Sequence, residues 1–243
     1  MTVSARILTP LIKLILSGLC RIDASELERV PRSGPLIIVT NHVNFLEVPI
    51  LYTRLFPRDI VGIIKRETWD NPLLGALADS WGALAIDRGA SDLAAMRSAL
   101  EVLDSGKILV LAPEGTRSGH GRLQKGHGGV VQIALKSGAR ILPIAHFGGE
   151  RFWKNLKSLR RTSFTIRVGQ AFTLVPPSGD GIPGDGAAGL GGAKVPDRRS
   201  VPKSVRIEMT DAVMNRLSLL LPEDRRGAYP EPESASMRYV RLS

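Results

Sequence analysis

The sequence predicts an α/β fold in which helices flank a central, mostly parallel sheet. Short apolar runs alternate with helical windows between about residues 36 and 168. The composition, with 43% hydrophobic and 23% charged residues in 243, is that of an ordinary globular protein. Polar residues also follow directly after two of the apolar runs, where parallel sheets place their ligands. Alternation of strands and helices is typical of a parallel sheet covered by helices.

Residues 1–30 form the first predicted segment, and residues 7–20 are the most apolar stretch of the chain. The stretch is about 14 residues long, whereas a helix that crosses a bilayer needs roughly 20 apolar residues. Apolar side chains recur in it at helical spacing. We therefore expect an apolar, amphipathic helix that lies either on a membrane surface or on the protein core.

Residues 31–175 carry the alternation and are predicted to form the main domain. The expected strands are residues 36–40, 60–64, 83–86, 107–112, 141–146 and 164–168, and the expected helices lie near residues 49–56, 71–80, 91–105 and 127–138. Residues 176–202 are rich in Gly and Pro and are predicted to form a flexible loop. Residues 203–221 are expected to add a last helix to the same domain, and residues 222–243 a polar, frayed tail.

The net charge of +10 is concentrated in one short stretch. Residues 151–175 hold six Lys and Arg side chains and no acid. Within this stretch, residues 151–161 place four apolar side chains near one face of an expected helix: Phe152, Trp153, Leu156 and Leu159. A basic amphipathic helix that contains Trp is typical of a membrane surface. The alternative is a helix that faces the core and keeps its basic face in water.

Several other classes of protein are disfavoured by composition. Aromatic residues make up 5% of the chain, too few for a surface that stacks on single strands, so we expect no nucleic-acid partner. Cys20 is the only cysteine, which excludes a disulfide within the chain and favours a reducing compartment. The four histidines are not spaced as ligand pairs, and we expect no metal site.

The first segment with chemical potential is the turn after the strand expected at residues 36–40. It holds His42, Asn44 and Glu47. Two residues five apart on a helix point about 140° away from each other, so we expect His42 in the turn and Glu47 in the next element. Glu47 can then fix the tautomer of His42 and leave the other ring nitrogen as a base. The alternative is that Asn44 and Glu47 merely form a helix capping box.

The second segment follows the strand expected at residues 107–112 and contains Glu114, Gly115, Thr116 and Arg117. An arginine can form paired hydrogen bonds with a phosphate group, and a threonine hydroxyl adds a donor. The segment therefore indicates recognition of a phosphorylated head group. The alternative is a polar turn with a surface arginine.

Together these segments resemble the glycerolipid acyltransferase family, in particular its 1-acylglycerol-3-phosphate O-acyltransferases. The family's first block is Asn-His, four further residues and an Asp, and here Glu47 stands where the family has Asp. The block Glu-Gly-Thr-Arg-Ser is unchanged at residues 114–118. Residues 86–88 are similar to the block between them, and Lys65, Lys125 and the apolar run at residues 141–144 lie in matching places.

The resemblance implies transfer of a fatty acyl group from acyl-CoA or acyl-carrier protein to a lysophospholipid hydroxyl. The most direct acceptor is 1-acylglycerol-3-phosphate, which gives phosphatidic acid. His42 and Glu47 are the implied catalytic pair. The implied substrate contacts are Lys65, Arg88, Glu114, Gly115, Thr116, Arg117 and Lys125. Glu114 is expected to position either the glycerol hydroxyls or Arg117, and no cofactor is expected.

Three alternatives stay open. The acceptor can be glycerol-3-phosphate or another lyso or amino lipid. Because Glu47 replaces the family's Asp, the chain can also be a non-catalytic member that only binds lipid.

We expect the protein at the cytoplasmic face of the membrane, peripheral or monotopic, with residues 7–20 and 151–161 in contact with lipid.

Overall fold

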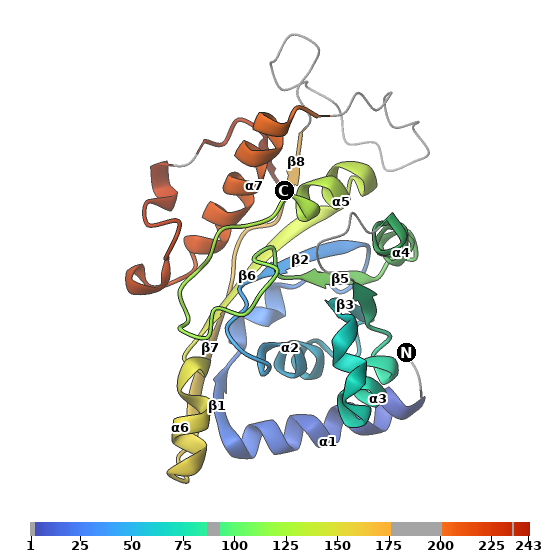
Figure 1. Ribbon diagram of the computed structural model, residues 1–243, viewed down its shortest axis with the longest axis vertical. Coiled ribbons are helices and arrows are strands. Elements are labelled where there is room, and N and C mark those ends of the chain that lie inside the picture. Colours follow the sequence, from blue (N-terminus) through green and yellow to red (C-terminus); the bar gives the residue numbers. More distant parts are fainter. Residues whose placement is uncertain (1–2, 87–92, 176–200, 235) are drawn as a thin grey trace.

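The computed structural model describes residues 3–86, 93–175, 201–234 and 236–243 (Figure 1). The described strands are β1 (Cys20–Asp23), β2 (Leu36–Thr40), β3 (Ile60–Lys65), β4 (Leu84–Ile86), β5 (Ile108–Leu111), β6 (Arg140–Phe147), β7 (Thr162–Val168), β8 (Phe172–Leu174) and β9 (Val240–Leu242). The described helices longer than one turn are α1 (Val3–Leu19), α2 (Glu47–Leu55), α3 (Pro72–Ser80), α4 (Leu93–Asp104), α5 (Gly129–Ser137), α6 (Phe152–Lys157) and α7 (Lys203–Ser218). Arg88 and most of the predicted Gly/Pro-rich loop lie outside the described residues.

The strands form one sheet in the order β1-β7-β6-β2-β5-β3-β4, and β8 and β9 extend it beside β6. The central strands β6, β2, β5, β3 and β4 pair in parallel, whereas the β6–β7, β6–β8 and β8–β9 pairs are antiparallel. The predicted mostly parallel sheet is therefore confirmed. In such a sheet the carboxyl ends of β2, β3 and β5 lie along one edge, which is where the polar segments follow.

Helices cover both faces of this sheet (Figure 1). Strand β2 shows the alternation that follows from the two-residue period of a strand. Leu36 and Ile38 belong to a core cluster with α1 and α2, whereas Ile37 and Val39 belong to a second cluster with α4, α5 and α7. Since both faces are buried, β2 reads in the sequence as a continuous apolar run.

The expectation that residues 222–243 form a frayed tail is wrong. Strand β9 pairs with β8, and Tyr229 and Tyr239 are buried. The backbone of Leu123 accepts from Ala228 N–H and donates to the Arg225 carbonyl. The aromatic rings and the backbone pairing outweigh the polar composition that suggested fraying.

Helix α1 carries apolar side chains on the side that faces away from the core as well as on the side that faces it. Its inward side packs against the core through Ala5, Thr9 and Leu16, but Ile7 and Leu14 on the other side are exposed to solvent. Both of its long sides are thus apolar, so one face lies on the core and the other has no cover in the described structure. None of the described helices is both long and apolar enough to cross a membrane.

Helix α6 is shorter than the amphipathic helix expected at residues 151–161. It ends at Lys157, and Phe152 and Leu156, which are four residues apart, face the core. Trp153 contacts the Phe152 ring but is 59% exposed, and Leu159 follows the helix and is 96% exposed. The expectation that all four apolar side chains share one face is therefore wrong, because the helix divides them between core and solvent.

Candidate active site

The turn between β2 and α2 brings His42 and Glu47 together. Glu47 is the first residue of α2, and its Oε1 atom is hydrogen-bonded to Nδ1 of the His42 ring. This arrangement confirms the predicted geometry, with the imidazole in the turn and the carboxylate reaching back to it. Since the carboxylate accepts this bond, its proton lies on Nδ1, and in the neutral form of the ring Nε2 is then the unprotonated nitrogen that can act as a base.

The capping interpretation holds only in part. Glu47 uses its two oxygens for different partners, but α2 begins at Glu47 with Leu46 as its N-cap and no side-chain cap bond, so Asn44 and Glu47 bond to each other in the turn before the helix. Oε2 accepts from the backbone N–H of Asn44 at 3.1 Å, and the Asn44 side chain accepts from Leu46 N–H at 2.8 Å. Pro49, the third residue of α2, costs no helical hydrogen bond, since the first four N–H groups of a helix have no helical partner. One carboxylate therefore both holds the turn before α2 and orients His42.

The environment of Glu47 favours its ionised form. The side chain is 2% exposed, and burial alone would raise its pKa. The hydrogen bond from His42 and the electrostatic influence of the His146 and His42 rings outweigh burial, so the pKa of Glu47 lies below its usual value. An ionised Glu47 stabilises the cation that forms when His42 takes up a proton.

Glu114 has a structural role that the sequence did not predict. Its Oε1 atom accepts from the backbone N–H of His42 at 2.6 Å, and its Oε2 atom accepts from the backbone N–H of Gln124 at 2.8 Å. Both oxygens thus bond to backbone groups, and the expectation that Glu114 positions the glycerol hydroxyls or Arg117 stays a prediction. Burial raises the pKa of Glu114 to about 7 although these two bonds lower it. Glu114 thus holds the backbone of His42 in place through this hydrogen bond.

The loop after β5 runs beside the His42 turn. The Ser118 N–H donates to the His42 carbonyl at 2.8 Å and the Gly119 N–H to the Val43 carbonyl at 3.1 Å. These bonds hold the exposed residues Thr116 and Arg117 directly beside His42. Gly115 has a φ of +67°, a conformation that favours glycine and lets the loop turn at this point.

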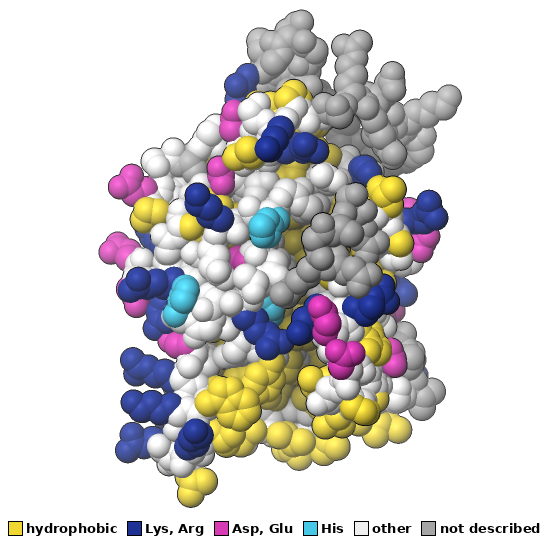
Figure 2. All heavy atoms as spheres, viewed as in Figure 1, with side chains coloured by type: hydrophobic (Ala, Val, Ile, Leu, Met, Phe, Trp, Pro, Cys, Tyr) yellow, Lys and Arg dark blue, Asp and Glu magenta, His cyan; other side chains and the backbone are white. Residues whose placement is uncertain are grey.

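Lys125 belongs to the same loop, and its neighbours fix it on both sides. Gln124 is bonded to Glu114, and the Gly126 N–H donates to the Tyr229 hydroxyl at 3.1 Å. Lys65 ends β3 and so lies along the same edge of the sheet. Figure 2 shows Lys and Arg side chains beside His side chains across the middle of this face. The structure thus brings all predicted site residues except Arg88, which is not described, to one edge.

A contact between His146 and Asn41 was not predicted from the sequence. The Asn41 amide donates to the His146 carbonyl and accepts from the His146 N–H, both at 2.9 Å. The His146 ring donates from Nε2 to the Asn41 carbonyl at 2.7 Å, and burial lowers its pKa. This pair joins β6 to the residue that precedes His42. Nothing in the local sequence indicates it, because it depends on β6 lying next to β2.

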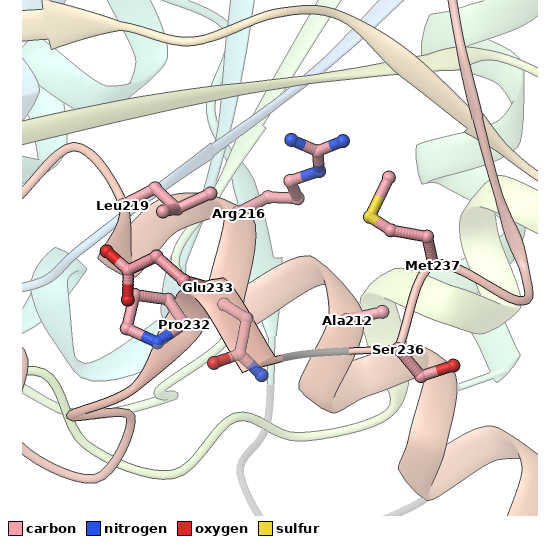
Figure 3. A pocket seen from close by; sticks show the side chains of 8 residues that line it. Ala212, Arg216, Leu219, Pro232, Glu233, Ser236 and Met237 are labelled. Atoms are coloured by element: carbon pink, nitrogen blue, oxygen red, sulfur yellow. The ribbon is translucent and has the colours of Figure 1, made fainter.

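A shallow hollow on α7 takes no part in this site (Figure 3). It lies between the helix and the C-terminal segment and is lined by Ala212, Asn215, Arg216, Leu219, Pro232, Glu233, Ser236 and Met237. Arg226 forms an ion pair with Glu233 at its rim, at 3.1 Å. It shares no residue with the predicted site, and we assign it no function.

Comparison with known proteins agrees with this geometry. The model of the family described as Acyltransferase matches residues 21–146, which is more than half of the chain. A Pseudomonas aeruginosa protein named lyso-ornithine lipid O-acyltransferase is 34% identical over 112 residues, 46% of this chain and 42% of that protein. A Limnanthes alba 1-acyl-sn-glycerol-3-phosphate acyltransferase is 34% identical over 134 residues, 54% of this chain and 45% of that protein. The chain thus matches about half the length of these curated relatives.

A solved structure shares the fold. The crystal structure of the 1-acyl-sn-glycerophosphate acyltransferase PlsC from Thermotoga maritima aligns with a TM-score of 0.56 and 22% identity, covering 69% of this chain and 68% of that chain. The matched family residues include the His42 turn and the loop that begins at Glu114. This chain is a member of the acyltransferase family.

Proposed function

We propose that the protein transfers a fatty acyl group from acyl-CoA or acyl-carrier protein to the free hydroxyl of 1-acylglycerol-3-phosphate. The observation that carries the proposal is the His42–Glu47 pair. Its Nδ1 side is occupied by an ionised carboxylate, and Nε2 has no hydrogen-bond partner among the described residues. A neutral imidazole held in this way is suited to general base catalysis.

The reaction needs no covalent enzyme intermediate. Nε2 of His42 takes the proton of the acceptor hydroxyl while the hydroxyl oxygen attacks the thioester carbonyl carbon. The carbon–sulfur bond then breaks, and the departing thiolate takes the proton from His42 to form a thiol. Glu47 stabilises the imidazolium between the two steps, and Glu114 and Asn41 hold the turn that carries His42.

Positive charge beside His42 favours a phosphorylated acceptor. Arg117 and Thr116 lie next to the His42 turn, and Lys65 and Lys125 lie along the same edge. A guanidinium with two lysines supplies the donors that a phosphate monoester requires. Arg88 stays a predicted contact. We propose no cofactor for this reaction.

A second acceptor deserves a test because of one relative. The Pseudomonas aeruginosa protein is named for lyso-ornithine lipid, which carries an amine. An amine is recognised by acids, but Glu47 in the turn and Glu114 in the neighbouring loop are already bonded to the protein. The charge of the site therefore favours the phosphate lipid as acceptor.

A panel of acceptors tests the proposal. Purified protein is incubated with acyl-CoA or acyl-carrier protein and with 1-acylglycerol-3-phosphate, glycerol-3-phosphate or lyso-ornithine lipid, and products are measured by mass spectrometry. We expect phosphatidic acid, and a loss of about 10²–10⁴-fold in rate for His42→Ala. His120→Ala, a change to an exposed histidine outside the pair, is the matched control. Transfer that is unaffected by His42→Ala would exclude the mechanism.

We also propose that α1 and the α6 region contact a membrane surface at its cytoplasmic face, as a peripheral or monotopic protein. Helix α1 exposes apolar side chains, and its C-terminal end is bonded to the segment that follows α6, because Arg161 donates to the carbonyls of Ser17 and Cys20. The cations Arg151, Lys154, Lys157 and Arg160 have no acidic partner among the described residues. Unpaired cations beside exposed apolar groups are suited to anionic lipid.

The backbone after α6 supports this proposal. Leu159 has a φ of +53°, and the N–H groups of Leu159 and Arg160 donate to the carbonyls of Leu156 and Asn155. This is a Schellman motif with leucine at the position that usually holds glycine. An exposed leucine held in a left-handed conformation costs about 1–2 kcal/mol and points to a role outside the fold. Binding should be stronger to anionic than to neutral vesicles and should fall as salt rises.

A further inference from the structure

Three aromatic rings join the catalytic turn to α6. Phe45 contacts Phe152 edge to face, with ring centroids 5.8 Å apart, and Trp153 at 5.5 Å. Phe152 and Trp153 contact each other at 5.3 Å. Phe152 is buried and anchors the group in the core, whereas Phe45 is 40% and Trp153 59% exposed. The two exposed rings, Phe45 and Trp153, are called the aromatic strip here.

The aromatic strip is held in a fixed position relative to His42. Asn44, the residue before Phe45, donates from its side chain to the Gly149 carbonyl at 2.8 Å, just before α6. The backbone N–H of Asn44 donates to Glu47, which also holds the His42 ring. A single carboxylate therefore connects the base to the residue that precedes the strip. Both rings of the strip stay in contact with solvent.

The strip lies between two surfaces of different character. On one side are His42 and the loop of Arg117, which suit a phosphorylated head group. On the other side are Leu159 and the exposed apolar side chains of α1. Figure 2 shows this hydrophobic area below the central Lys, Arg and His side chains, with cations along its edge where Figure 1 places α6. An amphiphile with its head group beside His42 would extend its chain across the strip.

We propose that the aromatic strip binds the acyl chain of the lysolipid acceptor, close to the head group. The proposal rests on the proposed function. The acceptor is chosen over the acyl donor because the strip continues toward the proposed membrane contact, where a lysolipid resides, whereas the thioester donor arrives from water. Aromatic rings that leave half of their surface open gain free energy when a hydrocarbon chain covers them.

Acceptors of two chain lengths test the proposal. Transfer to hexanoyl and to oleoyl lysophosphatidate is measured without vesicles, each acceptor below its critical micelle concentration. For Phe45→Ala and Trp153→Ala, we expect the ratio of kcat/KM for the long chain to that for the short chain to fall about 10-fold, through KM. Ile207→Ala, which removes an exposed apolar side chain from α7, is the control and should leave the ratio unchanged. Circular dichroism checks that each variant is folded.

Two results would overturn the proposal. One is an equal loss for both acceptors, which would mean that the rings act only on the fold or on membrane binding. The other is a change that follows the chain length of the acyl donor instead, which would assign the strip to the donor.

A binding measurement separates this proposal from the proposed function. The inactive variant His42→Ala is mixed with lysophosphatidate that carries a brominated chain, and tryptophan fluorescence is followed. We expect quenching that disappears when Trp153→Phe is added, while Trp69 and Trp81 still emit. Quenching without any acyl transfer by the wild type would reject the proposed function and keep the strip. Quenching that is unaffected by Trp153→Phe would reject the strip.

Discussion

The catalytic turn and the α6 region differ in how their side chains are satisfied. At the turn, two buried glutamates, Glu47 and Glu114, have a protein partner for each of their oxygens. Around α6, four cations have no acidic partner among the described residues, and Trp153 and Leu159 are largely exposed. The turn is therefore complete within the protein except for one ring nitrogen of His42. In the α6 region the cations lack acidic partners within the described protein, and apolar side chains stay exposed to solvent. This difference is what we expect between a catalytic site and a surface that binds a membrane.

After the loss already expected for His42→Ala, the largest effect is that of Glu47→Gln, which separates the bond to His42 from the bond to Asn44. The glutamine oxygen can still accept from Asn44 N–H, so α2 should begin as before. Its amide, however, donates to Nδ1 of His42 and moves the ring proton to Nε2, which removes the base. We expect transfer to slow by roughly 10²–10³-fold at nearly unchanged stability. Steady-state kinetics and thermal unfolding measure the two effects.

Glu47→Ala provides the comparison for this variant, because it removes both bonds. It should lose activity to a similar degree and lose stability as well. If Glu47→Gln keeps the wild-type rate while Glu47→Ala is only less stable, the role of Glu47 is capping alone.

The next effect concerns pH, because Glu114 is a buried acid that costs stability when ionised. Its pKa is about 7 in the folded chain and lies near the usual 4.5 when unfolded. Between these values the folded chain binds more protons, so the free energy of unfolding falls as pH rises from about 4.5 to 7, by about 1–3 kcal/mol. Glu47, whose pKa is lowered, loses its contribution only below this window.

Glu114→Gln removes this titration. Denaturant unfolding of the wild type and of Glu114→Gln at pH 5 and pH 7.5 gives the free energy of unfolding of each protein at each pH. We expect the wild type to lose stability relative to the variant as pH rises. If the two proteins differ in free energy of unfolding by the same amount at both pH values, Glu114 does not have a raised pKa.

The smallest effect is expected in the α6 region and has opposite signs for stability and binding. Leu159→Gly relieves a left-handed leucine and should raise the free energy of unfolding by about 1 kcal/mol. The same change removes an apolar group from the proposed membrane contact and should weaken vesicle binding by about 5-fold. Leu159→Ala is the control, since it removes the side chain but keeps the strained backbone. Equal vesicle binding by all three proteins would contradict the docking role.

Much of the candidate site could be predicted from local sequence. The strand before His42 is a continuous apolar run, and the five-residue spacing to Glu47 excludes a shared helical face. Those two facts place the imidazole in a turn and the carboxylate in the next helix, as observed. The choice between dyad and cap could not be made, because one carboxylate has two oxygens and only the fold decides what each meets.

Other features depended on neighbours that are distant in sequence. His146 meets Asn41 only because β6 pairs with β2, and β9 is ordered only because β8 offers it an edge. The sequence predicted an amphipathic helix over eleven residues at α6. In the structure Phe152 and Leu156 pack against the core, and the helix ends at Lys157. Periodicity records which side chains share a face, and it does not record which face another element covers.

The sequence by itself determined the mostly parallel α/β fold, the position of His42 after a strand and the excess of positive charge at residues 151–175. Each of these follows from local pattern, because strand burial, turn geometry and charge are properties of neighbouring residues. The tertiary structure alone decided that Glu114 holds the His42 backbone, that Arg161 closes the end of α1, and that Phe45 touches Trp153. Those contacts join residues that are 72, 141 and 108 positions apart, and only packing brings such distant groups together.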